Sequence, residues 1–390
     1  MSGRPPAPAA WLTPSPRTRH PLRIAVLATS RYPIRQPFAG GLEALVWQLV
    51  DRLRDRGHDV TLFAAEGSDE VDPDYAFPAG GWDPSPVARG DRSMPAAAFM
   101  RDHHAYLRVL MALSGPLAER FDVIHNHALH HLPVAMAPLL PAPMLTTLHT
   151  PPTPWLESAI AATPGHVSRH ARFAAVSGFV AWQWSDLLPL PGPDVVLNGV
   201  DLTAWPAGPG GGDVLAWSGR IVPEKAPHLA IEAAQRAGMP LVISGPISDP
   251  EYFYEAVRPR LGRTAEYAGH LSVPELAQLV GAAAAVLVTP RWDEPYGLVG
   301  AEALACGTPV VAFRRGGLPE VLGDAEVGCL VAPDDVEAMA AAVPTVLALD
   351  RRAVRAYAER YLSLDRMVSR YERHYHRMTT GAAVGADRTA

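Results

Sequence analysis

Short apolar segments alternate with amphipathic segments along most of the chain, and a Pro- and Gly-rich run at residues 206–213 divides them into two blocks. The first block opens with the apolar segment 22–28, which is typical of a strand buried in a parallel sheet. An amphipathic helix is expected over residues 42–56, ended by Gly57, and a second strand over 59–64. This alternation predicts an α/β protein with two Rossmann-like, doubly wound parallel-sheet domains that face a cleft.

Further elements are expected in each block. In the first block they are a mostly helical stretch at 94–118 and strands at 122–125, 144–149, 172–176 and 194–197. In the second block, strands are expected at 214–218, 240–244, 265–267, 284–289, 308–313 and 329–331, and helices at 226–237, 273–282, 336–349 and 351–361. Pro344 should break or kink the third of these helices.

The expected division of the chain is an unstructured leader at 1–20, an N-terminal domain at 21–200, a C-terminal domain at 201–361 and an unstructured tail at 379–390. A final amphipathic helix, within 362–378, places Met367, Tyr371 and Tyr375 on one face.

Composition excludes several classes of protein. The net charge is −6 and no long basic tract occurs, so nucleic acid is not an expected partner. The only two cysteines, Cys306 and Cys329, favour a reducing compartment, and we expect a cytoplasmic protein. No run of 18 apolar residues occurs, so no transmembrane helix is expected; peripheral membrane contact and the oligomeric state stay open.

The stretch 291–311, RWDEPYGLVGAEALACGTPVV, has the pattern loop, helix, Gly stop, strand. Pro295 fits the first helical position, and the backbone N–H groups of Tyr296, Gly297, Leu298 and Val299 are expected to be free at the positive end of the helix dipole. Glu294 lies before the helix and Glu302 inside it, and ionised carboxylates accept hydrogen bonds from sugar hydroxyls. The alternative to a ligand-binding role is that Glu294 is a capping acid and Glu302 a solvated helix residue.

Two glycine-bearing loops follow predicted strands. Gly40 and Gly41 let the backbone approach a ligand at the start of the first helix, although such pairs commonly make turns only. In the second block, Gly219 and Arg220 follow a strand, with Lys225 five residues later. A guanidinium and an ammonium at one strand end can hold a diphosphate, and the alternative is two surface cations.

Several histidines and tryptophans are weaker candidates for residues of the site. His149 ends an apolar strand, which favours a position at the cleft, and His127 is a candidate on the acceptor side. The His125–His127 pattern has no carboxylate or Cys tied to it, and the acidic triplet at 72–74 lies in a loop without a preceding strand, so no metal is expected. Trp182 is an acceptor-side candidate, although core packing is the commoner role for a helical Trp.

These residues together resemble the GT-B glycosyltransferases of family 4, over nearly all of residues 22–378. The family's Glu-x7-Glu signature is matched by EPYGLVGAE, from Glu294 to Glu302. The resemblance also includes, in the family's order along the chain, the pair Gly40 and Gly41, the sequence TLH ending at His149, the sequence NGVD at 198–201, and Arg220 with Lys225.

The resemblance implies a retaining glycosyltransferase that needs no metal and no other cofactor. The donor would be a nucleotide-diphosphosugar in the C-terminal domain, with UDP- and GDP-sugars expected, and the acceptor a natural-product, glycan or lipid hydroxyl in the N-terminal domain. It further implies that the final helix crosses back to the N-terminal domain.

The resemblance also assigns roles to individual residues. Glu302 would hold the ribose and Glu294 the sugar hydroxyls, with His149 near the sugar. Arg220 and Lys225 would neutralise the leaving diphosphate, over which Gly40 and Gly41 close. A nucleotide-sugar 2-epimerase and a non-catalytic sugar-nucleotide-binding module are the alternatives, and both are disfavoured by the complete set of residues.

Overall fold

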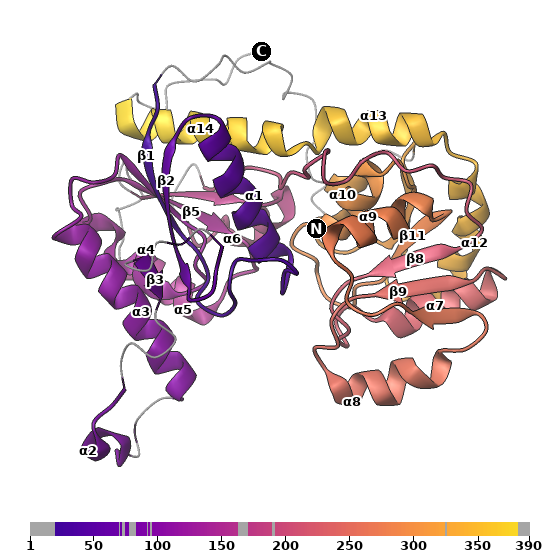
Figure 1. Cartoon of the computed structure of the whole chain (residues 1–390), viewed down its shortest axis with the longest axis horizontal. Coiled ribbons are helices and arrows are strands. Elements are labelled where there is room, and N and C mark those ends of the chain that lie inside the picture. The colour runs from indigo at the N-terminus through magenta and orange to yellow at the C-terminus, as the bar shows by residue number, and fades with distance from the viewer. Residues whose placement is uncertain are drawn as a thin grey trace.

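The structure is a computed structural model that describes residues 20–69, 71, 75–77, 83–91, 93, 96–162, 171–188, 192–323 and 326–380. It has two lobes side by side, each built on a parallel sheet with helices on both faces (Figure 1). This confirms the prediction of two doubly wound parallel sheets, the GT-B arrangement. Among the described residues, no helix is both long enough and apolar enough to cross a membrane.

The N-terminal sheet has seven strands in the order β3-β2-β1-β4-β5-β6-β7. They are β1 (Arg23–Leu27), β2 (Asp59–Ala65), β3 (Ala76–Phe77), β4 (Val123–Asn126), β5 (Met144–Leu148), β6 (Ala171–Ala175) and β7 (Asp194–Val195). The helices of this lobe are α1 (Gly41–Asp55), α2 (Pro86–Arg89), α3 (Ala97–Ser114), α4 (His131–Met136), α5 (Pro154–Ala161) and α6 (Gly178–Trp184).

The second sheet has six strands in the order β10-β9-β8-β11-β12-β13. They are β8 (Leu215–Ser218), β9 (Leu241–Ser244), β10 (Ala265–Tyr267), β11 (Ala285–Val288), β12 (Val310–Phe313) and β13 (Gly328–Val331). The helices are α7 (Pro227–Arg236), α8 (Pro250–Tyr252), α9 (Val273–Ala282), α10 (Leu298–Ala305), α11 (Leu318–Leu322), α12 (Val336–Leu347), α13 (Arg351–Tyr361) and α14 (Leu364–Thr380).

Alternate residues of β1 face opposite layers, as the pleat of a strand requires. Ile24 and Val26 pack with α1 and α14, whereas Ala25 and Leu27 pack with α3. All four side chains are fully buried, which explains why this strand is a continuous apolar run rather than an alternating one.

Two sequence expectations need correction. α12 runs through Pro344 without the expected break, because Met339, Val343 and Val346 hold the helix against the sheet with little or no exposure. The Pro- and Gly-rich run is a docked connection rather than a free spacer. A Cβ atom on Gly208 would lie 2.2 Å from the carbonyl oxygen of Gly281, so only glycine allows this approach.

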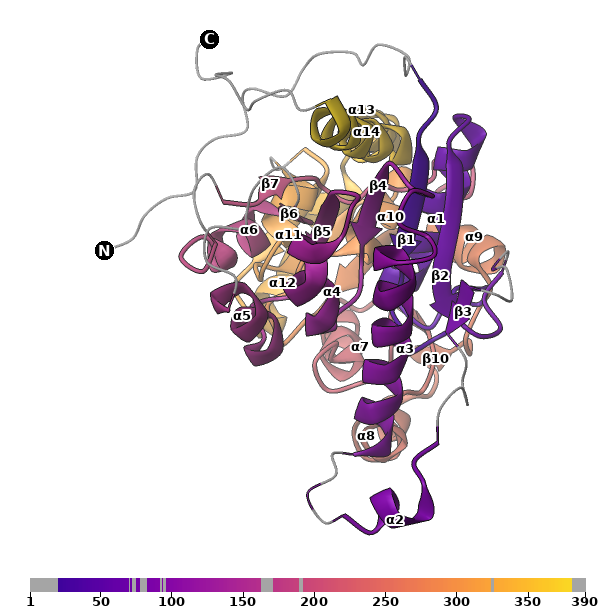
Figure 2. The same cartoon turned by 90° about the vertical axis from the view of Figure 1, so that its left-hand side faces the viewer.

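α14 crosses from the C-terminal lobe to the N-terminal lobe, in line with α13 (Figures 1 and 2). Its apolar face buries Met367, Tyr371 and Tyr375 completely or nearly so, as the sequence predicts. The helix extends to Thr380, two residues past its expected end at Met378.

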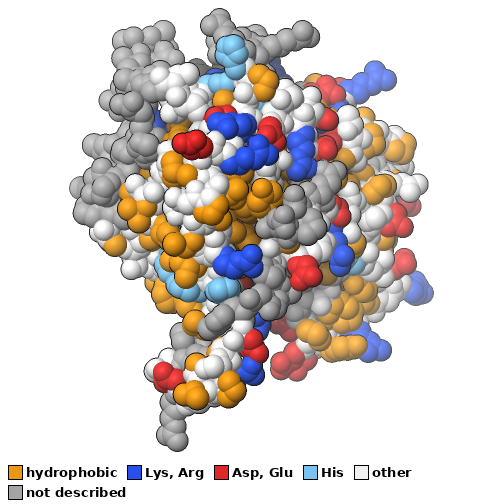
Figure 3. Space-filling model, turned by 60° about the vertical axis from the view of Figure 1, so that its left-hand side comes forward, with side chains coloured by type: hydrophobic (Ala, Val, Ile, Leu, Met, Phe, Trp, Pro, Cys, Tyr) orange, Lys and Arg blue, Asp and Glu red, His pale blue; other side chains and the backbone are white. Residues whose placement is uncertain are grey.

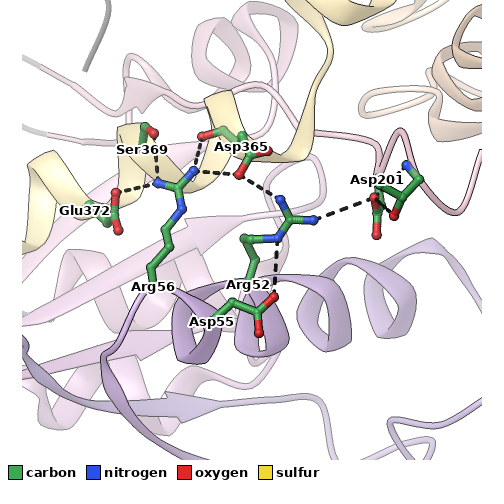
Figure 4. A network of polar contacts seen from close by, with 8 residues as sticks. Arg52, Asp55, Arg56, Asp201, Asp365, Ser369 and Glu372 are labelled. Atoms are coloured by element: carbon green, nitrogen blue, oxygen red, sulfur yellow. Dashed lines mark hydrogen bonds and ion pairs between the residues drawn. The ribbon is translucent and has the colours of Figure 1, made fainter. Parts of the chain in front are cut away.

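An ionic network joins α14 to the end of α1 (Figure 4). Arg56 donates to the buried Glu372 carboxylate at 2.7 Å and to Asp365 at 2.8 Å. His58 accepts from a backbone N–H through Nδ1, so its Nε2 carries the proton shared with Glu372 at 3.2 Å. Arg52 reaches Asp365 at 2.8 Å, on the more exposed side.

We expect Arg56→Ala to lower the free energy of unfolding of the N-terminal domain by about 3 kcal/mol, because Glu372 would stay buried with only His58 beside it. Arg52→Ala is the matched control. Its partner Asp365 has a side chain that is 60% exposed, so the expected loss is about 0–1 kcal/mol. Urea denaturation measures both variants, and equal losses would contradict this account of the network.

Candidate active site

The order of each sheet reverses at one place, between β1 and β4 and between β8 and β11. Ligands of open parallel sheets bind at such switch points, outside the carboxyl ends of the strands. In the second sheet, the loop after β8 carries Arg220 and Lys225, and the loop after β11 carries Glu294. The topology therefore brings these three residues to one edge, as their positions after predicted strands indicate.

The helix that follows Glu294 begins later than its sequence suggests. α10 starts at Leu298, so Pro295 is not its first residue. Gly297 precedes the helix with φ 101° and ψ 54°, a left-handed conformation that directs the chain into α10. A Cβ atom there would also lie 2.5 Å from Leu318 Cδ2, so the position requires glycine.

The Tyr296 side chain enters the core and is 2% exposed, so only its backbone lies at the site. Gly307 ends the element with φ 70°, the left-handed residue that its sequence position predicts.

Glu294 has two side-chain partners. Its Oε2 atom accepts hydrogen bonds from the Lys225 ammonium and from Trp292 Nε1, the latter at 3.0 Å. The same ammonium lies 5.0 Å from the centroid of the Trp292 ring, in cation–π geometry. The Lys225 and Glu294 side chains are 22% and 15% exposed, which leaves one edge of the pair open. Trp292 is a site residue that the sequence analysis missed.

A glycine pair supports the Glu294 backbone. Gly317 N–H donates to the Glu294 carbonyl oxygen at 2.7 Å, and Gly316 adopts φ 57°. A Cβ atom on Gly316 would lie 2.1 Å from the same oxygen. The two glycines therefore let the loop after β12 pass directly under Glu294. The Gly-Gly pair at 316–317 is the sequence feature that could have indicated this close approach.

Glu302 differs from Glu294 in having no partner. Its carboxylate makes no hydrogen bond or ion pair with any residue that the structure describes, and burial raises its pKa from 4.5 to about 8. A desolvated carboxylate without donors is costly to the fold and is available to hydroxyl donors of a ligand.

We expect Glu302→Gln to stabilise the protein at alkaline pH. The raised pKa means that the folded chain keeps a proton on Glu302 where the unfolded chain has lost it, so wild-type stability falls as pH rises from 4.5 to about 8. Since glutamine does not ionise, the variant should gain about 2–4 °C in Tm at about pH 8.5, with little difference near pH 4.5. Thermal denaturation across this range tests the expectation, with the exposed Glu251→Gln as control; a constant difference at all pH values would contradict it.

The Arg220 side chain is more exposed to solvent than that of Lys225. Its guanidinium makes a 3.5 Å contact with Glu224 and is 42% exposed, so it is free to turn toward a ligand. Gly219 before it has φ 151°, and a Cβ atom on the neighbouring Gly245 would lie 1.8 Å from the Gly219 carbonyl oxygen. These two glycines allow the loops after β8 and β9 to pack backbone against backbone.

The loop with Gly40 and Gly41 reaches this edge from the N-terminal lobe. A Cβ atom on Gly41 would lie 2.9 Å from Leu298 Cδ1, so the loop touches the first residue of α10. Glu43, in the first turn of α1, is 5% exposed; burial raises its pKa, and the Arg220 guanidinium opposes that rise. Glu43 is a second residue that the sequence analysis missed, and it places a carboxylate opposite Arg220.

His149 is partly exposed and ends a chain of imidazoles whose other two members, His125 and His127, are buried. Its Nε2 atom lies 2.9 Å from His127 Nδ1, and His127 Nε2 lies 3.2 Å from His125 Nδ1. The hydroxyl of Tyr375, on α14, reaches His125 at 2.7 Å. Burial lowers the pKa of His149 to about 3, so this ring is neutral near pH 7.

The side chain of His127, which is predicted on the acceptor side, is fully buried in this structure and lies 2.9 Å from His149. Trp182 is 69% exposed and packs against Phe179, so it can meet an acceptor. Trp184, by contrast, is fully buried and donates to the Thr150 carbonyl oxygen. Asp72 and Asp74 of the acidic triplet lie outside the described residues.

Hydrogen bonds between described residues also join the lobes beside the site. Ser177 Oγ donates to the Pro295 carbonyl oxygen at 2.6 Å. Glu320, from α11, accepts from the backbone N–H groups of Gly178 and Phe179 at 2.7 and 2.8 Å. A carboxylate from one lobe therefore caps a helix of the other, which fixes α6 next to the loop that carries Glu294.

Two sequence profiles match the chain, one on each lobe. The profile described as Glycosyltransferase Family 4 matches residues 39–204, and that described as Glycosyl transferases group 1 matches residues 207–361. A glycogen synthase of Mycobacterium tuberculosis is 31% identical over 368 residues, covering 83% of this chain and 87% of the relative. The chain belongs to the group 1 glycosyltransferases of family 4.

Two further similarities concern this glycosyltransferase. A D-inositol 3-phosphate glycosyltransferase of Saccharomonospora viridis is 28% identical over 403 residues, covering 87% of this chain and 91% of the relative. The Anabaena protein HepE, solved in complex with UDP and glucose, has a TM-score of 0.65 at 18% identity and covers 93% of this chain and all of that one. The resemblance inferred from the motifs is thereby confirmed at the level of family and fold.

Proposed function

We propose that this glycosyltransferase moves a sugar from a nucleotide-diphosphosugar, UDP- or GDP-linked, to a hydroxyl of a natural product, glycan or lipid, with retention of anomeric configuration. The observation that carries the proposal is the contrast between two carboxylates on either side of the α10 N-terminus. Glu294 is held by Lys225 and Trp292, whereas Glu302 has no partner among the described residues.

The donor would extend along α10. Glu302 would accept hydrogen bonds from the ribose hydroxyls, and Glu294 from the hydroxyls of the transferred sugar. The diphosphate would then lie against the free backbone N–H groups of Leu298 and Val299, at the positive end of the α10 dipole. The Anabaena protein HepE supports UDP as one candidate nucleotide, because it was solved in complex with UDP and glucose.

The reaction breaks the bond between the anomeric carbon and the diphosphate, and negative charge develops on the leaving phosphate oxygen. Arg220 and Lys225 would neutralise that charge, and no metal ion would be needed. The acceptor hydroxyl would attack on the same face of the sugar that the diphosphate leaves, which accounts for retention, and its proton would pass to the departing phosphate. The acceptor would approach from the N-terminal lobe, near His149 and Trp182.

A donor screen followed by product analysis tests the proposal. Purified protein is first screened by thermal shift against nucleoside diphosphates and their sugars, and the stabilising donor is then incubated with candidate acceptors for mass spectrometry. We expect nucleoside diphosphate and a glycosylated product whose anomeric configuration matches that of the donor. Isomerised nucleotide sugar formed without acceptor would indicate an epimerase, and binding without any turnover a non-catalytic module; either result would overturn the proposal.

We expect turnover to survive treatment with EDTA, because Arg220 and Lys225 would neutralise the diphosphate in the proposed donor complex. The measurement is the initial rate of nucleoside diphosphate release before and after chelation, with added Mg²⁺ or Mn²⁺ as the comparison. A strict requirement for added metal would contradict the proposal and make Asp72 and Asp74 candidates again.

The proposed location is the cytoplasm. Both cysteines are free: Cys306 is buried and Cys329 is partly buried. Two unpaired thiols favour a reducing compartment, which supports this location.

A further inference from the structure

Three histidines meet at the carboxyl-end side of the N-terminal sheet, on elements that carry none of the donor-handling residues. His103 lies in α3, His130 caps the N-terminus of α4, and His131 is the first residue of α4. One ring nitrogen from each lies within 4.8 Å of the other two. All three side chains are partly exposed, and Figure 3 shows histidine side chains at the surface among hydrophobic ones.

Packing alone does not explain this cluster. Each ring has a buried nitrogen with no hydrogen-bond partner among the residues that the structure describes: His103 Nδ1, His130 Nε2 and His131 Nδ1. Each such nitrogen costs about 1–3 kcal/mol of desolvation, which an apolar side chain of similar size would avoid. The rings are held in place by neighbours, since His131 stacks on His130 with centroids 4.3 Å apart and on Trp155 at 5.3 Å.

The donor atoms of the cluster suit a bound metal cation. A neutral imidazole offers one lone pair, and imidazole is a common ligand of Zn²⁺, Cu²⁺ and Ni²⁺ and a poor one for Mg²⁺ and Ca²⁺.

We propose that His103, His130 and His131 bind one divalent transition metal ion, such as Zn²⁺, which bridges α3 to α4. Three protein ligands leave a fourth tetrahedral position for water. Because Zn–N distances are about 2.0–2.1 Å, the three nitrogens must draw closer than their present limit of 4.8 Å, and the stacked rings of His130 and His131 must turn so that their lone pairs converge.

Binding through His130 Nε2 requires the tautomer with the proton on Nδ1. That tautomer gives up the 3.2 Å hydrogen bond from Leu132 N–H. One such bond contributes only about 1 kcal/mol, which a metal–imidazole bond offsets. The site is separate from the donor site, so it adds a metal without changing the expectation that transfer survives EDTA.

The test titrates the full-length chain, free of any polyhistidine tag, with Zn²⁺ by isothermal calorimetry. We expect one ion per chain, no binding of Mg²⁺, and a visible absorption band typical of tetrahedral coordination when Co²⁺ replaces Zn²⁺. His103→Ala and His131→Ala should each weaken Zn²⁺ binding by more than the roughly 10–100-fold that loss of a second-shell partner causes.

The matched control is His104→Ala, the next residue of α3, which lies outside the cluster. A control of this kind is needed because the chain has 15 histidines. Circular dichroism and nucleotide binding check that the variants fold. The proposal fails if wild-type protein does not bind Zn²⁺, if His103→Ala and His131→Ala bind as tightly as wild type, or if His104→Ala loses as much affinity as they do.

Discussion

Arg220→Ala and Lys225→Ala are each expected to lower kcat by about two to three orders of magnitude, the usual effect of losing one preorganised charge-stabilising group. Arg220 gives the cleaner test. Its only side-chain hydrogen bond or ion pair among the described residues is the 3.5 Å one with Glu224, so its loss should leave the Lys225–Glu294 pair in place, although it removes the cation that opposes the raised pKa of Glu43. Steady-state assays with a saturating donor provide kcat for both variants.

Lys225→Ala should have an additional effect through Glu294. Without the ammonium, the Glu294 carboxylate keeps only Trp292 as a side-chain donor, and the position of the sugar-binding oxygen is less fixed. The double variant Lys225→Ala/Glu294→Gln should therefore lose less than the two single losses combined. Arg352→Ala, an exposed residue of α13, is the control. Wild-type turnover in both Arg220→Ala and Lys225→Ala would remove the two cations from the mechanism.

The second large effect is a separation of roles between the two glutamates. At about pH 8.5, where the Glu302 carboxylate is ionised, Glu302→Gln is expected to weaken binding of both donor and nucleoside diphosphate by about 1.5–3 kcal/mol, the contribution of hydrogen bonds to a charged acceptor. The raised pKa adds a pH dependence: because the ionised carboxylate is the stronger acceptor, wild-type affinity should rise toward pH 8, and that of the variant should not.

Glu294→Gln should leave free nucleoside diphosphate binding nearly unchanged and should slow transfer instead, because its contacts position the sugar at the transition state. Isothermal titration with the preferred nucleotide, followed by turnover assays, separates the two variants. Loss of nucleotide affinity in Glu294→Gln with normal affinity in Glu302→Gln would mean that the donor lies along α10 in the opposite direction.

Local sequence pattern was sufficient for the elements that carry the site. The strands before Gly219 and Glu294 are continuous apolar runs, and Gly307 marks the end of α10 by the left-handed conformation that glycine favours. The start of α10 was placed too early, because Pro295 is an ordinary first helical residue, whereas the left-handed turn at Gly297 depends on its packing against Leu318.

Residues defined by contacts between distant segments could not be found in this way. Glu43 becomes a site residue only because α1 faces Arg220 across the two lobes, and Glu320 only because α11 meets the start of α6. The burial of His127 is a third case, because it arises where His125, His149 and Tyr371 of the crossing helix meet this ring. Such positions depend on tertiary packing rather than on local pattern.

The most direct test of the donor site is a crystal structure of the protein with the nucleoside diphosphate selected by the donor screen. We expect both ribose hydroxyls within hydrogen-bond distance of Glu302, the diphosphate at the N-terminus of α10, and Arg220 and Lys225 in contact with its oxygens. A nucleotide bound elsewhere, or bound at α10 with Glu302 turned away from the ribose, would contradict the central claim.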